Sequence, residues 1–499
     1  MLFYSFEFLY LFYPLVCVVF FLLGKIWPNS PRAGIVWLTL SSLFFYAWWD
    51  YNYVILIAFS IIFNYFAGLR LRQFKSRALL IFAISLNLTL IGYYKYAGFL
   101  TEIVNALSGS GLDVGKIILP LAISFFTFQQ IAWLVDNYLG LIKSRERSFF
   151  QYALFVLFFP QLIAGPIVHH SEMMPQFGET KQRRFSWDNF SAGLSIFVLG
   201  LGKKVIIADN VAPIANSVFD GVTDATKIGF LDAWGGALAY TSQLYFDFSG
   251  YADMAIGLAL ILNIRLPINF NSPYQATSIS EFWRRWHMTL SRFLRDYLYI
   301  PFGGNRKGRY RRYLNLMLTM LLGGLWHGAN WTFVFWGGLH GLYLVINQMW
   351  SKLSPWRLPG FVSWFLTFIS VVFAWVFFRS ENFDTALAII SAMVRPESLR
   401  SSPDHAISIN IFGMTILAVS LLVAFILPNT QQLMRNKIES IEIYQAMSKL
   451  KYKLLGFRFS TPAIDWSISW LVILGVISTI SIWMLLDSTT INEFIYFQF

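Results

Sequence analysis

Apolar runs of membrane-spanning length recur along almost the whole chain, and they limit the fold more than any other feature. Early examples are YLFYPLVCVVFFLLG, VWLTLSSLFFYAWW and YVILIAFSIIFNYFAG. Of the 499 residues, 57% are hydrophobic and 13% are charged, which is more apolar surface than a soluble chain of this size can bury. We therefore predict an all-α polytopic membrane protein with about 11–13 transmembrane helices and no separate soluble domain. Shorter runs at 117–135 and 384–394 predict re-entrant or lateral helices.

The first apolar run and the net charge exclude several classes of protein. The run near residues 8–24 lacks a basic leader and a small-x-small cleavage site, so we expect a retained helix and not a removed signal peptide. It contains the single cysteine, Cys17, so neither a disulfide framework nor a cysteine metal site is expected. The six histidines are scattered, and we predict no metal site. The formal net charge of +12 fits positive cytoplasmic loops better than nucleic-acid binding.

Basic residues between the apolar runs predict the topology. Lys25 and Arg32 follow the first run, and basic residues at 70–77 follow the third. Both loops are interpreted as cytoplasmic, which places the N-terminus outside. The basic stretch 435–459 is interpreted in the same way, so the last run, 467–487, returns the C-terminus to the external face. The predicted parts are a transmembrane core (1–430), a basic cytoplasmic segment (431–466) and a last transmembrane helix with the terminal FIYFQF (467–499).

A basic and aromatic stretch at 269–312 interrupts the apolar pattern. Nine basic residues lie between Arg284 and Arg312, against two acidic residues, Glu281 and Asp296. Large apolar residues recur there at helical spacing, which predicts an amphipathic helix at the cytoplasmic surface. Such a helix suits lipid headgroups or an anionic soluble donor, and an ordinary positive loop is the simpler alternative. The residues at helical spacing are Trp283, Trp286, His287, Leu290, Phe293, Leu294, Tyr297 and Leu298.

His327 lies between two apolar runs in LLGGLWHGANWTFVFWGGLHG (321–341). A histidine at membrane depth is costly and indicates a functional site, although a hydrogen bond to a neighbouring helix would also account for it. Gly323, Gly324 and Gly328 predict a close approach of two backbones there. The other histidines, His340 and the paired His169 and His170, are interpreted as packing or interfacial residues.

Asp247 and Asp253 interrupt a further apolar region, YFDFSGYADMAIGLAL (245–260). Acidic side chains at such depth must be paired or face a wet cavity, and we expect structural pairs with the arginines of 284–295. The sequence contains no GxxxxGK[ST], HExxH or GxSxG motif, so ATP-driven transport, a zincin and an α/β-hydrolase are unsupported.

Six stretches together resemble the membrane-bound O-acyltransferase superfamily, in its bacterial alginate O-acetyltransferase-like subgroup. The longest is FNSPYQATSISEFWRRWHMTLSRFLRDYLYIPFGGNRKG, followed by LLGGLWHGANWTFVFWGGLHG; ISFFTFQQIAWLVDNY, FFPQLIAGPIV, QLYFDFSGYADMAIGLALIL and FAWVFFRSENFDTALAII extend the match. The resemblance implies a ring of tilted helices around a central tunnel, in the inner membrane of a bacterium. It maps the two histidines of the family onto His287 and His327, with His327 indispensable.

The same resemblance implies a substrate, a partner and further site residues. The donor would be cytoplasmic acetyl-CoA, with no bound cofactor, and the acceptor an extracytoplasmic polysaccharide that is esterified with the help of an SGNH-type partner. The donor or the tunnel would be contacted by a set of basic, aromatic and amide side chains. These are Arg284, Arg285, Arg295, Trp286, Trp326 and Asn330.

The terminal FIYFQF (494–499) resembles the aromatic end of the small membrane peptide of the lipoteichoic acid D-alanylation system. This resemblance implies that Tyr496 carries the acyl group as an ester, while Phe494, Phe497 and Phe499 fill apolar subsites. An aromatic anchor at the membrane interface is the alternative.

Three hypotheses follow for the whole protein. The first is an acetyl relay that uses His327 and Tyr496. In the second, His327 activates a polysaccharide or lipid hydroxyl directly, without the tyrosine. The third is a transporter whose buried polar residues line a pathway, although the inverted repeats that would support it are not visible.

Overall fold

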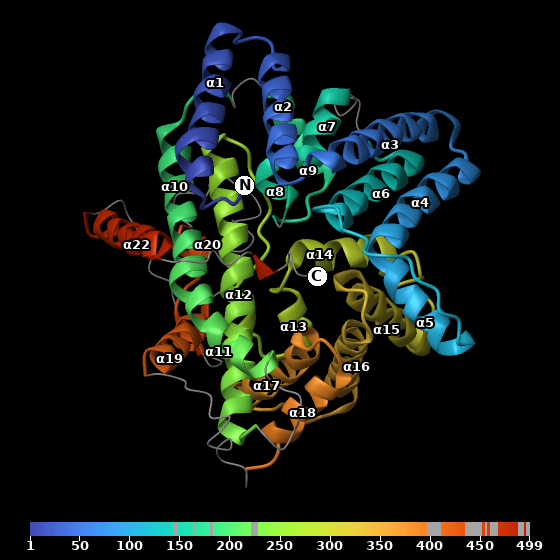
Figure 1. Ribbon diagram of the computed structural model, residues 1–499, viewed down its shortest axis with the longest axis vertical. Helices are drawn as coiled ribbons and strands as arrows, with labels where there is room; N and C mark the ends of the chain where they lie inside the picture. Colours follow the sequence, from blue (N-terminus) through green and yellow to red (C-terminus); the bar gives the residue numbers. More distant parts are fainter. Residues whose placement is uncertain are drawn as a thin grey trace. The chain divides into compact units, whose positions relative to one another are not determined.

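The computed structural model describes ten stretches of the chain: residues 1–142, 148–163, 165–179, 183–220, 228–396, 411–434, 452–454, 457–459, 468–487 and 494–495 (Figure 1). Over these residues the chain is almost entirely helical, which confirms the predicted all-α class. One short antiparallel hairpin, β1 (Tyr452–Leu454) and β2 (Phe457–Phe459), lies in the described part of the predicted cytoplasmic segment. The chain divides into two compact units, 1–197 with 254–267 and 198–253 with 268–499.

The first unit is built from the N-terminal helices. Its helix α1 packs against α2, α2 against α7, and α3 and α4 both against α6. One buried polar pair links two of these helices: the side-chain amides of Asn64 and Asn87 exchange two hydrogen bonds of 2.7 and 3.1 Å. The helices are η1 (Glu7–Phe12), α1 (Tyr13–Ile26), α2 (Arg32–Trp49), η2 (Tyr51–Tyr53), α3 (Val54–Phe74), α4 (Arg77–Ile91), η3 (Gly92–Tyr96), α5 (Ala97–Ser108), α6 (Ile123–Leu139), α7 (Phe149–Leu157), α8 (Phe159–Leu162) and α9 (His170–Gly178).

The second unit contains most of the polar residues singled out in the sequence. Two long helices, α10 (Trp187–Gly202) and α12 (Phe230–Ile261), run from one unit into the other. Within the unit, α16 packs against α15, α13 and α17, and α22 packs against η6. Its other helices are η6 (Lys203–Ala208), α11 (Asp209–Phe219), η8 (Pro273–Gln275), α13 (Ile279–Trp283), α14 (Met288–Leu294), η9 (Arg295–Tyr299), α15 (Gly308–His327), α16 (Trp331–Leu353), α17 (Gly360–Arg379), α18 (Phe383–Met393), α19 (Ile411–Ile426), α20 (Thr430–Leu433) and α22 (Ile468–Asp487).

Seven helical stretches in the described part of the chain are long and apolar enough to cross a membrane. Their burial differs: the apolar window of Phe230–Ile261 is 100% buried, whereas that of Ile468–Asp487 is 11% buried and exposes its large apolar side chains. Exposed apolar helices of this kind are stable in lipid, where every backbone polar group must be bonded within the helix. The seven stretches confirm a polytopic membrane protein, and the larger number of 11–13 spans stays a prediction.

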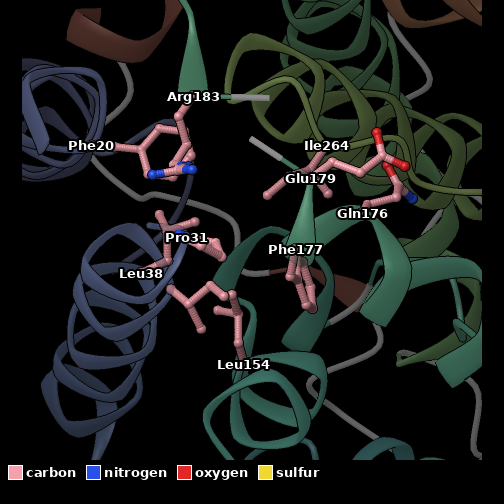
Figure 2. A pocket seen from close by; sticks show the side chains of 10 residues that line it. Phe20, Pro31, Leu38, Leu154, Gln176, Phe177, Glu179, Arg183 and Ile264 are labelled. Atoms are coloured by element: carbon pink, nitrogen blue, oxygen red, sulfur yellow. The ribbon is translucent and has the colours of Figure 1, made fainter. Parts of the chain in front are cut away.

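A small cavity in the first unit lies beside the buried side chain of Arg183. Arg183, Phe20, Leu154 and Phe177 are among the side chains around it (Figure 2). The guanidinium of Arg183 donates to three backbone carbonyls in the loop between α1 and α2. The cavity measures about 10 Å³, which is room for about one water molecule. Arg183 therefore ties a loop to the unit, and the cavity is too small for an acyl donor.

Candidate functional site

His327 is the last residue of α15 and lies at the end of a tightly packed helical hairpin. The backbones of α15 and α16 touch at Gly324 and Gly337. A methyl group on Gly324 would collide with the carbonyl of Phe333, and one on Gly337 with the carbonyl of Met320. The expected close backbone approach therefore occurs at Gly324, whereas Gly323 and Gly328 face the side chains of Leu294 and Phe333. The contact at Gly324 fixes the position of His327 relative to α16.

The ring of His327 is enclosed by aromatic side chains. Trp336 lies perpendicular to it, with ring centroids 5.2 Å apart, and Phe378 of α17 lies 5.3 Å away. Trp326 completes the wall at 4.9 Å, and the histidine is only 4% exposed. Such a wall excludes bulk water, which strengthens any electrostatic interaction that the imidazole makes during a reaction.

His287 lies beside this group, with its ring centroid 6.5 Å from that of His327. It is fully buried and adopts a left-handed backbone conformation, φ 41°. The side-chain oxygen of Asn269 accepts from both the backbone N–H and the hydroxyl of Thr289, and it lies 3.1 Å from His287 Nδ1. Because this oxygen is an acceptor, Nδ1 carries the proton and Nε2 carries the lone pair.

Burial lowers the pKa of His287 to about 3, so its imidazole is neutral near pH 7. A neutral ring does not attract an anionic donor through charge. Its Nε2 is therefore a weak base, and the ring can accept a hydrogen bond or orient its neighbours.

The left-handed residue also corrects the predicted amphipathic helix. The helical spacing over 283–298 predicts one continuous helix, whereas the chain forms α13, a turn ending at His287, α14 and the π-helix η9. A left-handed residue cannot continue an α-helix. The break turns His287 toward Phe248 of α12, with ring centroids 4.8 Å apart.

The three arginines assigned to the donor have different environments. Arg285 is 8% exposed and its guanidinium donates to the carboxylate of Glu281 at 2.8 and 3.1 Å. Arg295 pairs with its neighbour Asp296 at 2.7 Å. Arg284 is exposed and bonds the backbone one turn earlier. Arg285 is thus part of the local structure, and Arg284 is the one of the three that remains at the surface without an acidic partner in the described part of the chain.

The three remaining residues assigned to the donor or the tunnel are held within the unit. Trp286 and Trp326 are 2% and 6% exposed. Asn330 caps α16 by accepting from the N–H of Thr332 at 3.0 Å, and its amide donates to the carbonyl of Glu381 at 2.7 Å. Asn330 therefore orders the turn that follows His327.

The partners of the two buried aspartates differ from those expected. Asp247 and Asp253 pair with Lys204 and Lys203, at 2.9 and 2.6 Å, and not with the arginines of 284–295. The two lysines are consecutive residues of η6, and both lie against α12 at Gly250, between the two aspartates. Lys204 and Asp247 are 2% and 1% exposed, and neither charge would be stable there alone.

Two residues of the terminal motif are described, and both are buried against α12. Phe494 is 0% exposed and lies 4.8 Å from the ring of Tyr251 and 5.7 Å from that of Phe248. Ile495 is 4% exposed, and its backbone N–H donates to Asp247 Oδ2 at 2.8 Å. The other four residues of the motif, Tyr496, Phe497, Gln498 and Phe499, lie outside the described residues.

Three further side chains shape this site and were not singled out from the sequence: Asn269, Lys204 and Phe378. Lys204 could have been found, because it lies within the apolar run 190–207, where a charge demands a partner. Asn269 and Phe378 carry no such signal, since nothing in their local sequence connects them to the histidines.

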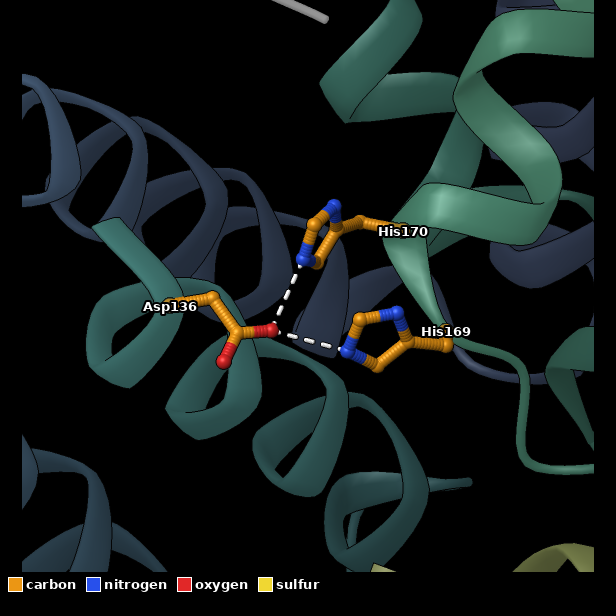
Figure 3. A group of neighbouring side chains, drawn as sticks. All are labelled: Asp136, His169 and His170. Carbon is orange, nitrogen blue, oxygen red and sulfur yellow. Dashed lines mark hydrogen bonds and ion pairs between the residues drawn. The ribbon is translucent and has the colours of Figure 1, made fainter. Parts of the chain in front are cut away.

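A different cluster lies in the first unit, where Asp136 Oδ2 is 2.8 Å from Nε2 of both His169 and His170 (Figure 3). The three ligand atoms lie within 4.8 Å of one another, so these residues could hold a metal ion. However, the N–H of Ser171 donates to Nδ1 of His169, which leaves the proton on Nε2 facing the carboxylate. The arrangement fits a hydrogen-bonded cluster better than a set of metal ligands.

Comparison with known proteins places these residues in a family. The membrane-bound O-acyltransferase family matches residues 142–383, a region that includes His287 and His327. Peptidoglycan O-acetyltransferase of Helicobacter pylori is 47% identical over 417 residues, covering 78% of each chain.

Two other relatives agree with this match. Probable alginate O-acetylase AlgI of Pseudomonas aeruginosa is 42% identical over 402 residues, covering 79% of this chain and 75% of the relative. Teichoic acid D-alanyltransferase of Bacillus subtilis is 27% identical over 282 residues, covering 54% of this chain and 70% of the relative. The chain therefore belongs to the membrane-bound O-acyltransferase family and is a membrane O-acyltransferase.

Proposed function

We propose that this enzyme takes an acetyl group from cytoplasmic acetyl-CoA, holds it as an ester on Tyr496 and passes it on for O-acetylation of an extracytoplasmic polysaccharide. An SGNH-type partner would complete the last step outside the inner membrane. The names of the most similar relatives support a polysaccharide acceptor, alginate in one case and peptidoglycan in another.

The observation that carries the relay is the position of residues 494–495. Phe494 contacts Phe248, Phe248 contacts His287, and His287 lies beside His327. One peptide unit after Ile495 comes Tyr496, and consecutive Cα atoms are about 3.8 Å apart. An interfacial anchor would need only contact with lipid, whereas this segment is buried against the same helix that contacts the candidate histidine.

The first chemical step forms an aryl ester. The phenol oxygen of Tyr496 attacks the thioester carbonyl of acetyl-CoA, the new C–O bond forms, and the C–S bond breaks. A phenol has a pKa of about 10, so it needs a base near neutral pH. His327 would take the phenol proton and then deliver it to the departing thiolate, giving free CoA-SH. General base catalysis of this kind contributes about 100- to 10,000-fold to the rate.

The second step moves the acetyl group to a sugar hydroxyl. The hydroxyl oxygen attacks the ester carbonyl, the bond to the phenol oxygen breaks, and the tyrosine recovers its proton. Phenolate is a better leaving group than an alkoxide, so this transfer is downhill. Coenzyme A is large and multiply charged and cannot cross hydrocarbon, whereas an acetyl group on a protein side chain needs no such crossing.

The test is mass spectrometry of the purified protein after incubation with acetyl-CoA. We expect an adduct of one acetyl group on the C-terminal peptide of the wild type. The adduct should be absent from Tyr496→Phe, which lacks the nucleophile, and from His327→Ala, which lacks the base. Phe497→Leu serves as a matched control, because it changes a neighbouring aromatic residue and leaves the phenol in place.

The outcome separates the two enzymatic hypotheses. An unmodified protein that still acetylates its polysaccharide, with Tyr496→Phe as active as the wild type, would refute the relay and favour direct activation of the acceptor by His327. Membership of an acyltransferase family replaces the transporter hypothesis.

A further inference from the structure

The segment that precedes Tyr496 is held by a buried charged pair. Asp247 uses both carboxylate oxygens: Oδ1 lies 2.9 Å from Lys204 Nζ, and Oδ2 accepts the backbone N–H of Ile495 at 2.8 Å. Lys204 Nζ also lies 2.9 Å from Asp209 Oδ1. Asp247 and Lys204 are almost fully buried. Because Lys204 neutralises a buried carboxylate, Asp247 can remain charged and accept a charge-assisted hydrogen bond, which is stronger than a neutral one.

The neighbouring Lys203–Asp253 pair holds a different segment of the chain. Lys203 pairs with Asp253, but that carboxylate accepts from the side chains of Thr430 and Gln431, at 2.6 and 2.7 Å. Two adjacent lysines therefore support two aspartates of α12, and each aspartate holds a different later segment of the chain. Asp253 contacts side chains, whereas Asp247 contacts a main-chain donor.

The main-chain contact fixes the chain next to the proposed nucleophile. A bond from the N–H of Ile495 sets the position of the residue immediately before Tyr496. Phe494 adds a second point of attachment, since its ring lies against Tyr251 and Phe248. Asp247, Phe248 and Tyr251 are neighbours on α12, so one helix supplies all three of these contacts.

We propose that Asp247, kept charged by Lys204, is a positioning residue that holds the main chain at Ile495 and so presents Tyr496 for acyl transfer. This inference rests on the proposed function and goes beyond it by naming the attachment of the terminal segment. Holding a nucleophile in place raises its effective concentration at the reaction centre, so loosening the attachment lowers the transfer rate and leaves donor binding unchanged.

The experiment removes each end of the hydrogen bond separately in the full-length protein. Asp247→Asn keeps the shape of the acceptor and removes its charge. Ile495→Pro removes the N–H and leaves Asp247 and Lys204 intact, so it remains informative if Asp247→Asn folds poorly. Ile495→Ala is the matched control that keeps the N–H, and Asp253→Asn is the control in the neighbouring pair.

Two readouts are measured on each variant. Hydrogen exchange of the C-terminal peptide reports whether the Ile495 amide is protected, independently of any chemistry. The rate of acetylation of the same peptide, measured at several acetyl-CoA concentrations, separates the rate constant from KM. We expect Asp247→Asn and Ile495→Pro to lower the rate constant by about ten- to a hundredfold at unchanged KM, with the double variant no slower than the singles. In Asp247→Asn, the Ile495 amide should also lose protection.

The outcomes are distinguishable. If the Ile495 amide stays as protected from exchange in Asp247→Asn as in Asp253→Asn, then Asp247 does not hold the terminal segment, and the proposal is overturned. Lost protection at an unchanged acetylation rate overturns the positioning role. A wild type that never acquires the acetyl group refutes the relay, and then the positioning role with it, while the exchange measurement still decides whether Asp247 holds the segment.

Discussion

The described part of the chain contains two pairs of neighbouring histidines, one in each unit, and their surroundings differ. His169 and His170 have ring centroids 4.2 Å apart and share one oxygen of Asp136. His287 and His327 lie 6.5 Å apart among aromatic rings and the amide of Asn269. A shared carboxylate keeps the proton of each ring on the nitrogen that faces it, so both imidazoles act as hydrogen-bond donors. Aromatic walls exclude bulk water and strengthen the electrostatic interactions of an imidazole, which favours general base catalysis in acyl transfer.

The largest expected effect is on acetyl transfer, which should depend on His327 and not on His170. His327→Ala should lower acetyl transfer by at least about 100-fold, because it removes the proposed base. His170→Ala should transfer acetyl groups at a rate close to that of the wild type and unfold at a lower temperature. The check is acetylation of the C-terminal peptide, with thermal unfolding measured on the same samples. Equal losses of transfer in both variants would show that the comparison is wrong.

The next effect concerns the carboxylate that links the first pair. Asp136→Asn should lower the free energy of unfolding by about 2 kcal/mol, since a neutral amide oxygen accepts weaker hydrogen bonds from the two imidazole N–H groups than a carboxylate oxygen does. Asp188→Asn, at an exposed position in the first turn of α10, should cost less than about 1 kcal/mol. Chemical denaturation in detergent measures both. A loss in Asp136→Asn as small as that in Asp188→Asn would indicate that the cluster adds little to stability.

The free energy of unfolding should depend on pH because of His287 in the second pair. Its pKa is lowered from 6.5 to about 3 by burial, so the unfolded chain takes up a proton first as the pH falls. The stability that depends on the neutral ring is complete above about pH 6.5 and is lost toward pH 3, which amounts to about 2 kcal/mol between pH 7.5 and 5. His287→Asn tolerates the left-handed backbone and has no such group, so it should lose less. Unfolding curves at the two pH values test this difference, and equal losses would contradict it.

The smallest effect on stability is expected at the surface near His287. Arg284→Gln should change the free energy of unfolding by less than about 0.5 kcal/mol, because the side chain is exposed. If Arg284 contacts the donor, KM for acetyl-CoA should rise severalfold. Arg285→Gln, which breaks the bonds to Glu281 and to a backbone carbonyl, should cost about 1–2 kcal/mol. Steady-state kinetics and thermal unfolding of the two variants separate the roles, and an unchanged KM in Arg284→Gln would remove it from the donor site.

The sequence allowed the prediction of the helical class and the family, since both rest on long stretches: apolar runs set the class, and motifs around His287 and His327 indicated the family. The glycines between α15 and α16 were also readable, because a residue without Cβ is needed wherever two backbones meet. The break in the helix at His287 could not be predicted. The helical spacing of the large apolar residues continues across the turn, and only the hydrogen bonds between 269–271 and 285–289 show that the helix stops.

The partners of the aspartates were not predictable from charge density. Arginines are concentrated at 284–295, yet Lys203 and Lys204 pair with Asp253 and Asp247 because η6 adjoins α12 within the second unit. Long-range neighbours depend on how helices pack, which local composition does not record. The same holds for Ile495, whose contact is made by its backbone and leaves no trace in its side chain.

That backbone contact has a consequence for how such enzymes can diversify. A carboxylate that binds a main-chain N–H does not distinguish between side chains, so this bond excludes only proline at position 495, while the burial of residues 494 and 495 carries the selectivity for apolar side chains. Nor does the contact depend on a covalent connection between α22 and the rest of the chain. A split of the gene before the terminal helix would preserve every bond of the attachment, and one polypeptide or two could then carry out the same transfer.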